Sequence, residues 1–283
     1  MPPSSMEPGA AVERDVHVDG LRLRYRETGD PAAMPVLLLH GLMGHPREWD
    51  TLTAALTPRF RVIGLHQRGH GESDRAAEYA AAAMAGDVLG LADLLGLRRF
   101  HLVGHSMGGM VASLCAARRP DLVDRLVMID IGPDSLSAGF AEELPTVLGA
   151  FAEASYTRPD EAVDEWLAGN PLAREPLVRH YVEQSLVAGD DGLLRWRFDA
   201  AGLVGFATGG VTEGELWRAI DAITAPTLLV RGEHSPLLSR ATAERVVSRL
   251  ARGRLVEIPG GGHDLGVERP EAVATAVLDH LSE

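Results

Sequence analysis

The amino-acid sequence predicts an α/β fold built on a mostly parallel sheet with helices on both faces. Short apolar runs without polar alternation, which suit strands buried on both faces, occur at 36–40, 62–65, 100–103, 126–131, 227–230 and 255–258. Stretches of helical composition separate these runs, at 47–56, 76–95, 107–118, 241–250 and 270–281. Because strands that alternate with helices pair side by side in parallel, the helices are expected to cover both faces of the sheet.

The beginning of the chain predicts an antiparallel hairpin beside that sheet. An extended stretch at 15–18 is followed by Asp19-Gly20, a dipeptide favoured in two-residue hairpin turns. Over 21–26, leucine and tyrosine alternate with arginine, so one face of the second strand is apolar and the other faces water.

The alternation of strands and helices stops between residues 134 and 218. No apolar strand run occurs there, and alanine, glutamate, leucine and aromatic residues predict several helices. We therefore expect a core formed by 12–133 and 219–283, a helical cap at 134–218 and a flexible tail at 1–11. Most of the aromatic residues of the chain fall in the cap, where they either build its own core or line a ligand pocket.

Composition excludes several classes of function. The formal net charge is -13, which repels polyanions, so we expect no nucleic-acid partner. All 27 basic residues are arginine, because the chain contains no lysine, and this excludes Schiff-base chemistry. Cys115 is the single cysteine, which excludes an intrachain disulfide and a thiolate metal cluster. The apolar runs are far shorter than the roughly 20 residues that cross a bilayer, so we expect no membrane partner and a cytoplasmic protein.

A Gly-x-Ser-x-Gly pattern lies between the apolar run at 100–103 and the helical stretch at 107–118. It reads Gly104-His105-Ser106-Met107-Gly108. A serine at so sharp a turn adopts strained backbone angles, and the flanking glycines avoid a collision between strand and helix. The turn presents the Ser106 hydroxyl at the carboxyl end of the strand and points the Met107 N–H toward a nearby substrate oxygen. Ser106 is therefore the predicted nucleophile, and Met107 is a predicted oxyanion-hole donor.

A second backbone donor is expected from the loop after the first buried strand, His40-Gly41-Leu42-Met43-Gly44. Glycine lets such a loop approach a substrate oxygen closely. We assign the Leu42 N–H to the oxyanion hole, the alternative being that His40-Gly41 forms a simple turn. A donor of this kind typically lowers the barrier by roughly 3 to 4 kcal/mol.

The order and spacing of several motifs resemble those of the α/β-hydrolase family. The motifs are His40-Gly41, Gln67-Arg68-Gly69-His70-Gly71, Gly104-His105-Ser106-Met107-Gly108-Gly109 and Gly262-His263. The resemblance extends from about Val16 to the end of the chain and is weakest in the cap. It implies an eight-stranded, mostly parallel sheet and the order nucleophile, acid, histidine along the chain. It also implies that serine, where epoxide hydrolases and haloalkane dehalogenases of this fold carry aspartate, excludes their chemistry.

The base is predicted to be His263. A free serine hydroxyl is a poor nucleophile at neutral pH and needs a base. His263 follows Gly260-Gly261-Gly262, a stretch flexible enough to return over the carboxyl edge of the sheet, and it matches the histidine position of the family that the chain resembles. His105 and His70, which lie in or beside tight turns, are interpreted as structural.

The acid is the point where the chain departs from the commonest pattern of that family. In most members it lies after the seventh strand, three residues beyond a glycine, and here that position holds Ser235. The resemblance to a minority of members, whose acid follows strand six, implies Asp130 instead. The alternatives are that Asp130 caps the first turn of the cap, or that Glu233 or Asp134 is the acid. Asp264 ranks last, because neighbours in a loop rarely face one another.

Together these residues predict a cofactor-independent serine hydrolase, without a metal, that cleaves an ester, lactone, thioester or related acyl bond. Ser106, His263 and Asp130 are the expected catalytic residues. The aromatic cap is expected to select a small molecule with a moderately apolar acyl or alcohol group. Alternatives are a hydrolase of carbon–carbon bonds in vinylogous diketones, cofactor-free non-hydrolytic chemistry, and a ligand-binding protein on the same fold. A binding protein would be free to lose Ser106 or His263, and both are present.

Overall fold

The computed structural model describes residues 11–136 and 140–283, so the tail expected at 1–11 lies outside the described residues except for its last position. The centre of the fold is an eight-stranded sheet with the order β1-β2-β4-β3-β5-β6-β9-β10. Its strands are β1 (Val12–Val18), β2 (Leu21–Thr28), β3 (Met34–Leu39), β4 (Phe60–Leu65), β5 (Phe100–His105), β6 (Val123–Ile129), β9 (Thr227–Gly232) and β10 (Gly253–Ile258). β2 is antiparallel to β1 and to β4, and the other neighbours are parallel. The predicted eight-stranded, mostly parallel sheet is confirmed.

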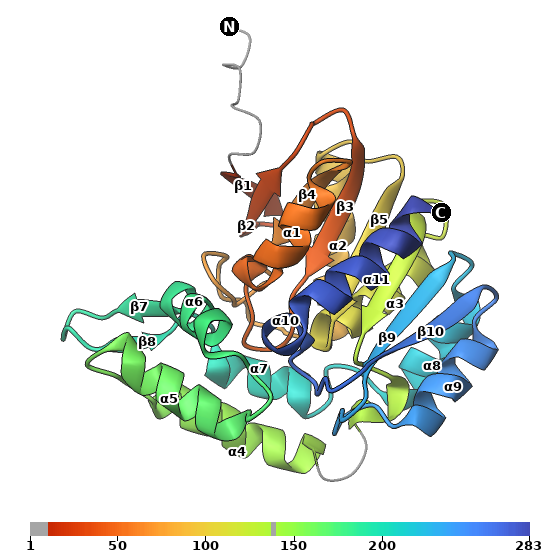
Figure 1. Ribbon diagram of the computed structural model, residues 1–283. Coiled ribbons are helices and arrows are strands. Elements are labelled where there is room, and N and C mark those ends of the chain that lie inside the picture. Colours follow the sequence, from red (N-terminus) through yellow and green to blue (C-terminus); the bar gives the residue numbers. More distant parts are fainter. Residues whose placement is uncertain (1–10, 137–139) are drawn as a thin grey trace, which may run out of the picture.

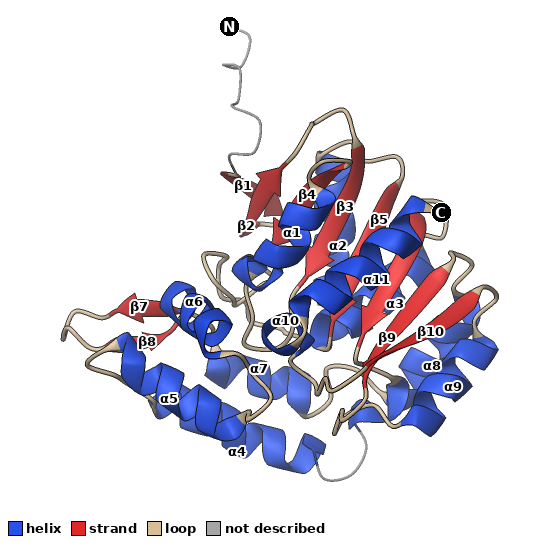
Figure 2. Cartoon of the chain, in the orientation of Figure 1, coloured by secondary structure: helices blue, strands red, loops and turns tan. Residues whose placement is uncertain are grey.

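Helices cover both faces of the sheet (Figure 1, Figure 2). One face carries α1 (Asp50–Leu56) and α11 (Pro270–Ser282). The other carries α2 (Ala81–Leu94), α3 (Met107–Arg118), α8 (Glu213–Ala222) and α9 (Arg240–Arg249). Successive side chains of β3 enter different cores: Leu37 and Leu39 pack on the side of α2 and α3, and Val36 and Leu38 on the side of α1 and α11. This alternation explains why a strand buried on both faces reads as a continuous apolar run.

Two short helices border the carboxyl edge of the sheet. η1 (Pro46–Trp49) follows the loop after β3, and α10 (Leu265–Glu268) follows the loop after β10. Throughout the described part of the chain, no helix has both the length and the apolar character needed to cross a membrane.

The predicted hairpin turn joins β1 and β2. Asp19 has a φ of 49° and Gly20 a φ of 84°, the two positive angles that let a two-residue turn match the twist of antiparallel strands. β2 then places Leu23 and Tyr25 in the core. The apolar positions of the alternating pattern are thus the buried ones.

The chain between β6 and α8 is mainly helical and lies beyond the carboxyl ends of the parallel strands (Figure 1). It contains η2 (Pro133–Leu136), α4 (Phe140–Glu153), α5 (Pro159–Gly169), α6 (Glu175–Ser185), β7 (Leu186–Ala188), β8 (Leu194–Trp196) and α7 (Ala200–Ala207). The helices agree with expectation, but the antiparallel hairpin of β7 and β8 does not. Each of these strands has 3 residues, too few to produce a periodic pattern in the sequence.

α8 crosses the predicted end of the cap at residue 218. The helix packs against α3, and its Leu216 and Ile220 belong to the same buried core as Met110 of α3. The division into a core (12–133 and 219–283) and a cap (134–218) therefore stays a proposal. Within that cap, residues 137–139 lie outside the described residues.

The loop after β4 ties the sheet to the end of the helical segment. The Gly71 N–H donates to the Arg197 carbonyl at 2.8 Å, and the Asp199 N–H donates to the Gly69 carbonyl at 2.7 Å. The Tyr79 hydroxyl donates to the Asp199 carboxylate at 2.6 Å. These bonds fix the start of α7 at the carboxyl edge of the sheet.

Buried neutral histidines predict that the fold is sensitive to acid. Burial lowers the pKa of His45 to about 3 and the pKa values of His70, His101 and His105 to about 4. In an unfolded chain these rings have a pKa of about 6.5. Between about pH 6.5 and about pH 4 the unfolded state therefore binds more protons than the folded state, so stability falls as the pH falls.

Urea titrations between about pH 7.5 and about pH 4.5 should show the free energy of unfolding decreasing steadily below about pH 6.5. A free energy that stays constant over this range would contradict the burial of neutral rings.

Candidate active site

Ser106 lies at the turn between β5 and α3, with φ 50° and ψ -120°. A non-glycine residue rarely adopts a positive φ, and such strain persists only where the surroundings hold it. A Cβ atom on Gly104 would overlap the Gly108 carbonyl, and one on Gly108 would overlap the Leu39 carbonyl. Glycine at both positions therefore allows α3 to approach β5 and β3, and the predicted nucleophile stands at the carboxyl end of β5.

Asp130 follows β6 and is fully buried, with a φ of 50°. Because β6 pairs with β9, its carboxylate reaches the loop that follows β9. Oδ1 accepts a hydrogen bond from the Gly232 N–H at 2.9 Å, and Oδ2 accepts one from the Ser235 hydroxyl at 2.6 Å. The Ser235 oxygen in turn accepts a hydrogen bond from the Leu238 N–H at 3.0 Å. The serine at the usual acid position of the family thus orients the aspartate that is predicted to replace it.

His263 links the other two side chains. Its Nδ1 lies 2.8 Å from Asp130 Oδ2, and its Nε2 lies 3.0 Å from Ser106 Oγ. With the Nδ1–H donating to the carboxylate, Nε2 is left to accept a hydrogen bond from the Ser106 hydroxyl. The structure therefore brings the residues Ser106, His263 and Asp130 into one series of hydrogen bonds. Their roles in catalysis remain predictions.

The alternative acids are bonded elsewhere. Glu233 accepts a hydrogen bond from the Gly260 N–H at 2.8 Å, and Asp134 accepts one from the Thr242 hydroxyl at 2.8 Å. Within the described ranges, the carboxylate hydrogen-bonded to the His263 ring is that of Asp130.

The surroundings of His263 raise its pKa. Burial opposes the charged imidazolium, but the hydrogen bond and the charge of Asp130 outweigh burial, and the charges of Asp264 and Glu268 add to them. The pKa of His105 is shifted in the opposite direction, although its ring centroid lies only 4.9 Å from that of His263. Burial lowers the pKa of His105 to about 4, and its Nε2 donates to the His263 carbonyl at 2.9 Å. His263 is thus suited to accept a proton, whereas His105 stays neutral.

A buried carboxylate that no sequence motif reveals holds the loop of His263. Glu268, at the end of α10, accepts hydrogen bonds from the backbone N–H groups of Gly262 and Asp264. The side-chain amide of Asn170, which follows α5, donates to Glu268 at 3.0 Å and to Asp264 at 2.8 Å. The loop is therefore fixed both by α10 and by the helical segment. A contact between residues so far apart in sequence leaves no local pattern.

The two predicted oxyanion donors come from the loop after β3 and from α3. Met107 is the first residue of α3, so its N–H has no acceptor within the helix. Leu42 lies in a turn closed by a hydrogen bond from the Gly44 N–H to the Gly41 carbonyl, at 3.0 Å. Leu42 and Ser106 line the same cavity. The role of these two N–H groups stays a prediction.

A cavity of about 560 Å³ lies beside Ser106 and His263. Its lining is mostly apolar, and the helical segment contributes Trp166 and Tyr181 to it. Trp196, by contrast, packs in a cluster of buried rings that includes Phe198, with 6.4 Å between the two ring centroids. Trp166 and Tyr181 also contact Trp196, so the rings that line the cavity are continuous with the internal aromatic cluster. The Phe140 side chain lies outside the described residues.

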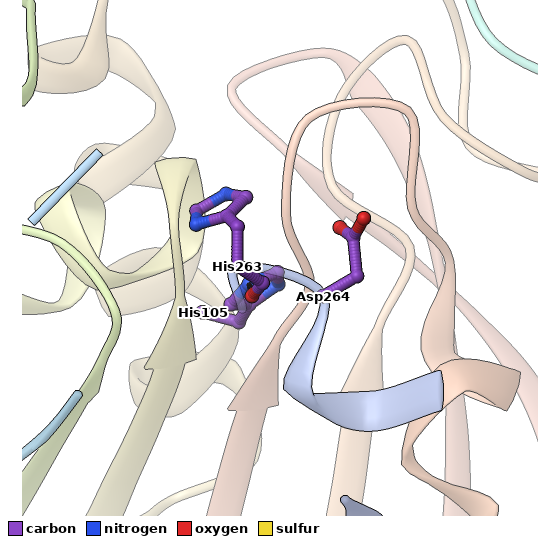
Figure 3. A group of neighbouring side chains, drawn as sticks. All are labelled: His105, His263 and Asp264. Atoms are coloured by element: carbon purple, nitrogen blue, oxygen red, sulfur yellow. Dashed lines mark hydrogen bonds between the residues drawn. The ribbon is translucent and has the colours of Figure 1, made fainter. Parts of the chain in front are cut away.

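His105, His263 and Asp264 lie close enough to share a metal ion, with one ligand atom of each within 4.8 Å of the others (Figure 3). Both ring nitrogens of His263 already take part in hydrogen bonds, with Asp130 and Ser106. The His105 Nε2 bonds to the backbone of His263. A metal ion held by the His263 ring would displace the bonds that join it to Ser106 or Asp130, so we assign no metal to this group.

Comparison with known proteins finds relatives over nearly the whole chain. The family model described as alpha/beta hydrolase fold matches residues 34–270. The chain is 31% identical over 273 residues to a 2-(acetamidomethylene)succinate hydrolase of Mesorhizobium japonicum, covering 95% of each protein. It is 28% identical over 250 residues to esterase YbfF of Escherichia coli, covering 88% of this chain and 93% of that protein. The crystal structure of E-2-(acetamidomethylene)succinate hydrolase matches with a TM-score of 0.88 at 28% identity, covering 97% of this chain and 100% of that one.

Replacing Glu268 by glutamine should lower the pKa of His263. The substitution removes a negative charge that favours the imidazolium and keeps the shape of the side chain. A decrease of at least about half a pH unit is expected in an NMR titration of the His263 ring. Glu271→Gln is the matched control, because it removes an exposed carboxylate that pairs with Arg174. An unshifted titration in Glu268→Gln would refute the electrostatic influence of Glu268.

Proposed function

Because the chain belongs to the alpha/beta hydrolase fold family and is a hydrolase, we propose that it is a cofactor-independent serine hydrolase acting on a carboxylic ester, lactone or related acyl bond. The observation that carries the proposal is the series of hydrogen bonds from Ser106 through His263 to Asp130, at 3.0 and 2.8 Å. A hydroxyl, an imidazole and a buried carboxylate in this order activate a serine for attack on a carbonyl.

In the first half of the proposed reaction, Ser106 becomes acylated. Nε2 of His263 takes the hydroxyl proton while Oγ bonds to the substrate carbonyl carbon, and the carbonyl electron pair moves to its oxygen. Asp130 stabilises the imidazolium, and the N–H groups of Leu42 and Met107 donate to the oxyanion. The tetrahedral intermediate then expels the alcohol, whose oxygen receives the proton from His263.

In the second half, water releases the acyl group. His263 is neutral again and takes a proton from a water molecule as the water oxygen bonds to the acyl carbon. The new tetrahedral intermediate breaks its bond to Ser106 Oγ, which recovers the proton from the imidazolium. The products are a carboxylic acid and the regenerated hydroxyl. The raised pKa of His263 supports this alternation between accepting and donating a proton.

The apolar lining of the cavity supports a small substrate with a moderately apolar acyl or alcohol group. Trp166 and Tyr181 provide rigid surfaces against which such a group packs. The esterase among the relatives supports an ester as the cleaved bond. A cytoplasmic location belongs to the same proposal, since a chain with one cysteine gains no disulfide from an oxidising compartment.

Ser106→Ala should abolish hydrolysis of short and medium chain p-nitrophenyl esters, because no other atom replaces Oγ in the acyl-enzyme. A fluorophosphonate probe should label the wild type at Ser106, as located by mass spectrometry of peptides, and should not label the variant. Ser248→Ala, which alters a hydroxyl bonded to the backbone on the exposed part of α9, is the control and should keep both activity and label. Esters cleaved at the wild-type rate by Ser106→Ala would disprove the proposed acyl-enzyme.

Asp130→Asn should lower kcat by about 10⁴-fold, because an amide neither fixes the reactive tautomer of His263 nor stabilises the imidazolium. Ser235→Ala removes one of the hydrogen bonds to the same carboxylate and should lower kcat by about tenfold. Stopped ester assays with both variants, and with Glu233→Gln as a control, measure the ranking. A larger loss in Ser235→Ala or Glu233→Gln than in Asp130→Asn would show that Asp130 is not the acid.

A further inference from the structure

The charged residues that line the cavity, apart from histidine, are acidic. Glu48, Glu143 and Asp264 contribute carboxyl groups, and the described lining includes no arginine. The undescribed residues supply none either, since 1–10 and 137–139 contain no arginine and the chain has no lysine. A negatively charged substrate group would therefore meet carboxyl groups and no permanently cationic side chain.

Glu48 lines the cavity, and among the described residues its ion-pair contact is the neutral ring of His105. Its side chain is 12% exposed, and its Oε1 accepts a hydrogen bond from the Gly41 N–H at 3.3 Å. His105 Nδ1 lies 3.9 Å from the same oxygen. The His105 proton is on Nε2, which donates to the His263 carbonyl, so the ring is neutral and offers Glu48 no positive charge.

Asp264 adds a second carboxylate from the loop between β10 and α10. Its Oδ2 accepts a hydrogen bond from the Asn170 amide at 2.8 Å, which is a neutral donor. Burial raises the pKa of Glu48 to about 8, the Gly41 N–H opposes this shift, and the charge of Asp264 adds to it. A further negative charge beside these groups would therefore be repelled by Asp264 at neutral pH, and by Glu48 as well once the pH exceeds about 8.

We propose that Glu48 and Asp264 are specificity-determining residues that exclude negatively charged acyl groups, so that the substrate carries an uncharged acyl group. This inference rests on the proposed serine-hydrolase function. The chain would then differ in substrate charge from the relative that is 31% identical to it, because that relative is named for 2-(acetamidomethylene)succinate and succinate is a dicarboxylate. Repulsion between unit charges a few ångströms apart in a partly buried site is large enough to change substrate preference by about tenfold or more.

Two matched p-nitrophenyl esters test the exclusion: the 4-carbamoylbutyrate and the 4-carboxybutyrate, which differ only in a terminal amide or carboxylate. The measured quantity is the ratio of kcat/KM for the amide ester to kcat/KM for the carboxylate ester. Within one variant, the folded fraction and the reactivity of Ser106 cancel in this ratio. The wild type should favour the amide ester by at least about tenfold at about pH 7.5.

Asp264→Asn should lower the ratio about fivefold or more, because it removes one of the repelling charges. Glu142→Gln is the matched control. It removes an exposed carboxylate from α4, next to the cavity residue Glu143, and should leave the ratio unchanged.

The pH dependence of the ratio tests Glu48 separately. As the pH rises through about 8, Glu48 gains its charge, so the wild-type preference for the amide ester should increase severalfold. In Glu48→Gln this increase should be absent. The other titratable or charged groups on Glu48's own and neighbouring elements, and on the loops beside it, are His40, His45, Arg47, Asp50, Arg61, His105, Glu175, Arg179, His180, Tyr181, Glu183, His263, Asp264 and Glu268. Burial keeps the pKa of His105 at about 4 and that of Tyr181 well above its usual range, so neither ring titrates near pH 8.

Different outcomes separate the two proposals. Turnover of both esters at equal rates, or a preference for the carboxylate ester, would overturn the charge exclusion and leave the serine-hydrolase function standing. Turnover of neither ester by the wild type, together with no fluorophosphonate label on Ser106, would overturn the proposed function and this inference with it.

Discussion

The hydrogen bond between Asp130 and His263 is the interaction on which the rest of the site depends. It raises the pKa of His263 against the effect of burial and leaves Nε2 directed at Ser106. Both partners are held by other groups: Asp130 by the Gly232 N–H and the Ser235 hydroxyl, and the His263 loop by Glu268. The carboxylate of Asp130 therefore binds the His263 ring, and that of Glu268 binds the loop. The charges of both favour the imidazolium form of His263.

Backbone strain gathers at the same edge of the sheet. Apart from Asp19 in the hairpin turn, the described non-glycine residues with a positive φ are Met43, Ser106 and Asp130. They follow β3, β5 and β6, which are neighbours in the sheet. Parallel strands end at one edge, so three sharp turns meet there. Met43 and Ser106 line the cavity, and Asp130 carries its buried carboxylate to the His263 ring beside it. The rigid sheet holds these unfavourable conformations in place.

Much of this arrangement is predictable because it is encoded locally. The strained turn at Ser106 requires glycines at fixed positions, and the buried strands require continuous apolar runs. Asp130 is predictable only indirectly, through the serine at position 235. Asn170 is not predictable, because its bonds reach residues about a hundred positions away. Glu268 bonds to residues near it in the chain, but no sequence motif distinguishes it from other acidic residues. Glu48 is hidden for the same reason, since only the folded loop after β3 brings it to His105.

In this chain the acid follows β6 and a serine follows β9, where most members of the family carry the acid. This arrangement is possible because positions 130 and 235 lie close together. Ser235 Oγ lies 2.6 Å from Asp130 Oδ2, so the two loops place their side chains in one small volume beside His263 Nδ1. Two carboxylates at that distance would repel strongly in a buried site, and one would take up a proton. A single carboxylate is therefore compatible with the site. A hydroxyl is the suitable partner, because it donates to the carboxylate while its oxygen accepts from the backbone. A carboxylate that follows either strand therefore lies close to the imidazole. The histidine can act as a base with the acid at either position.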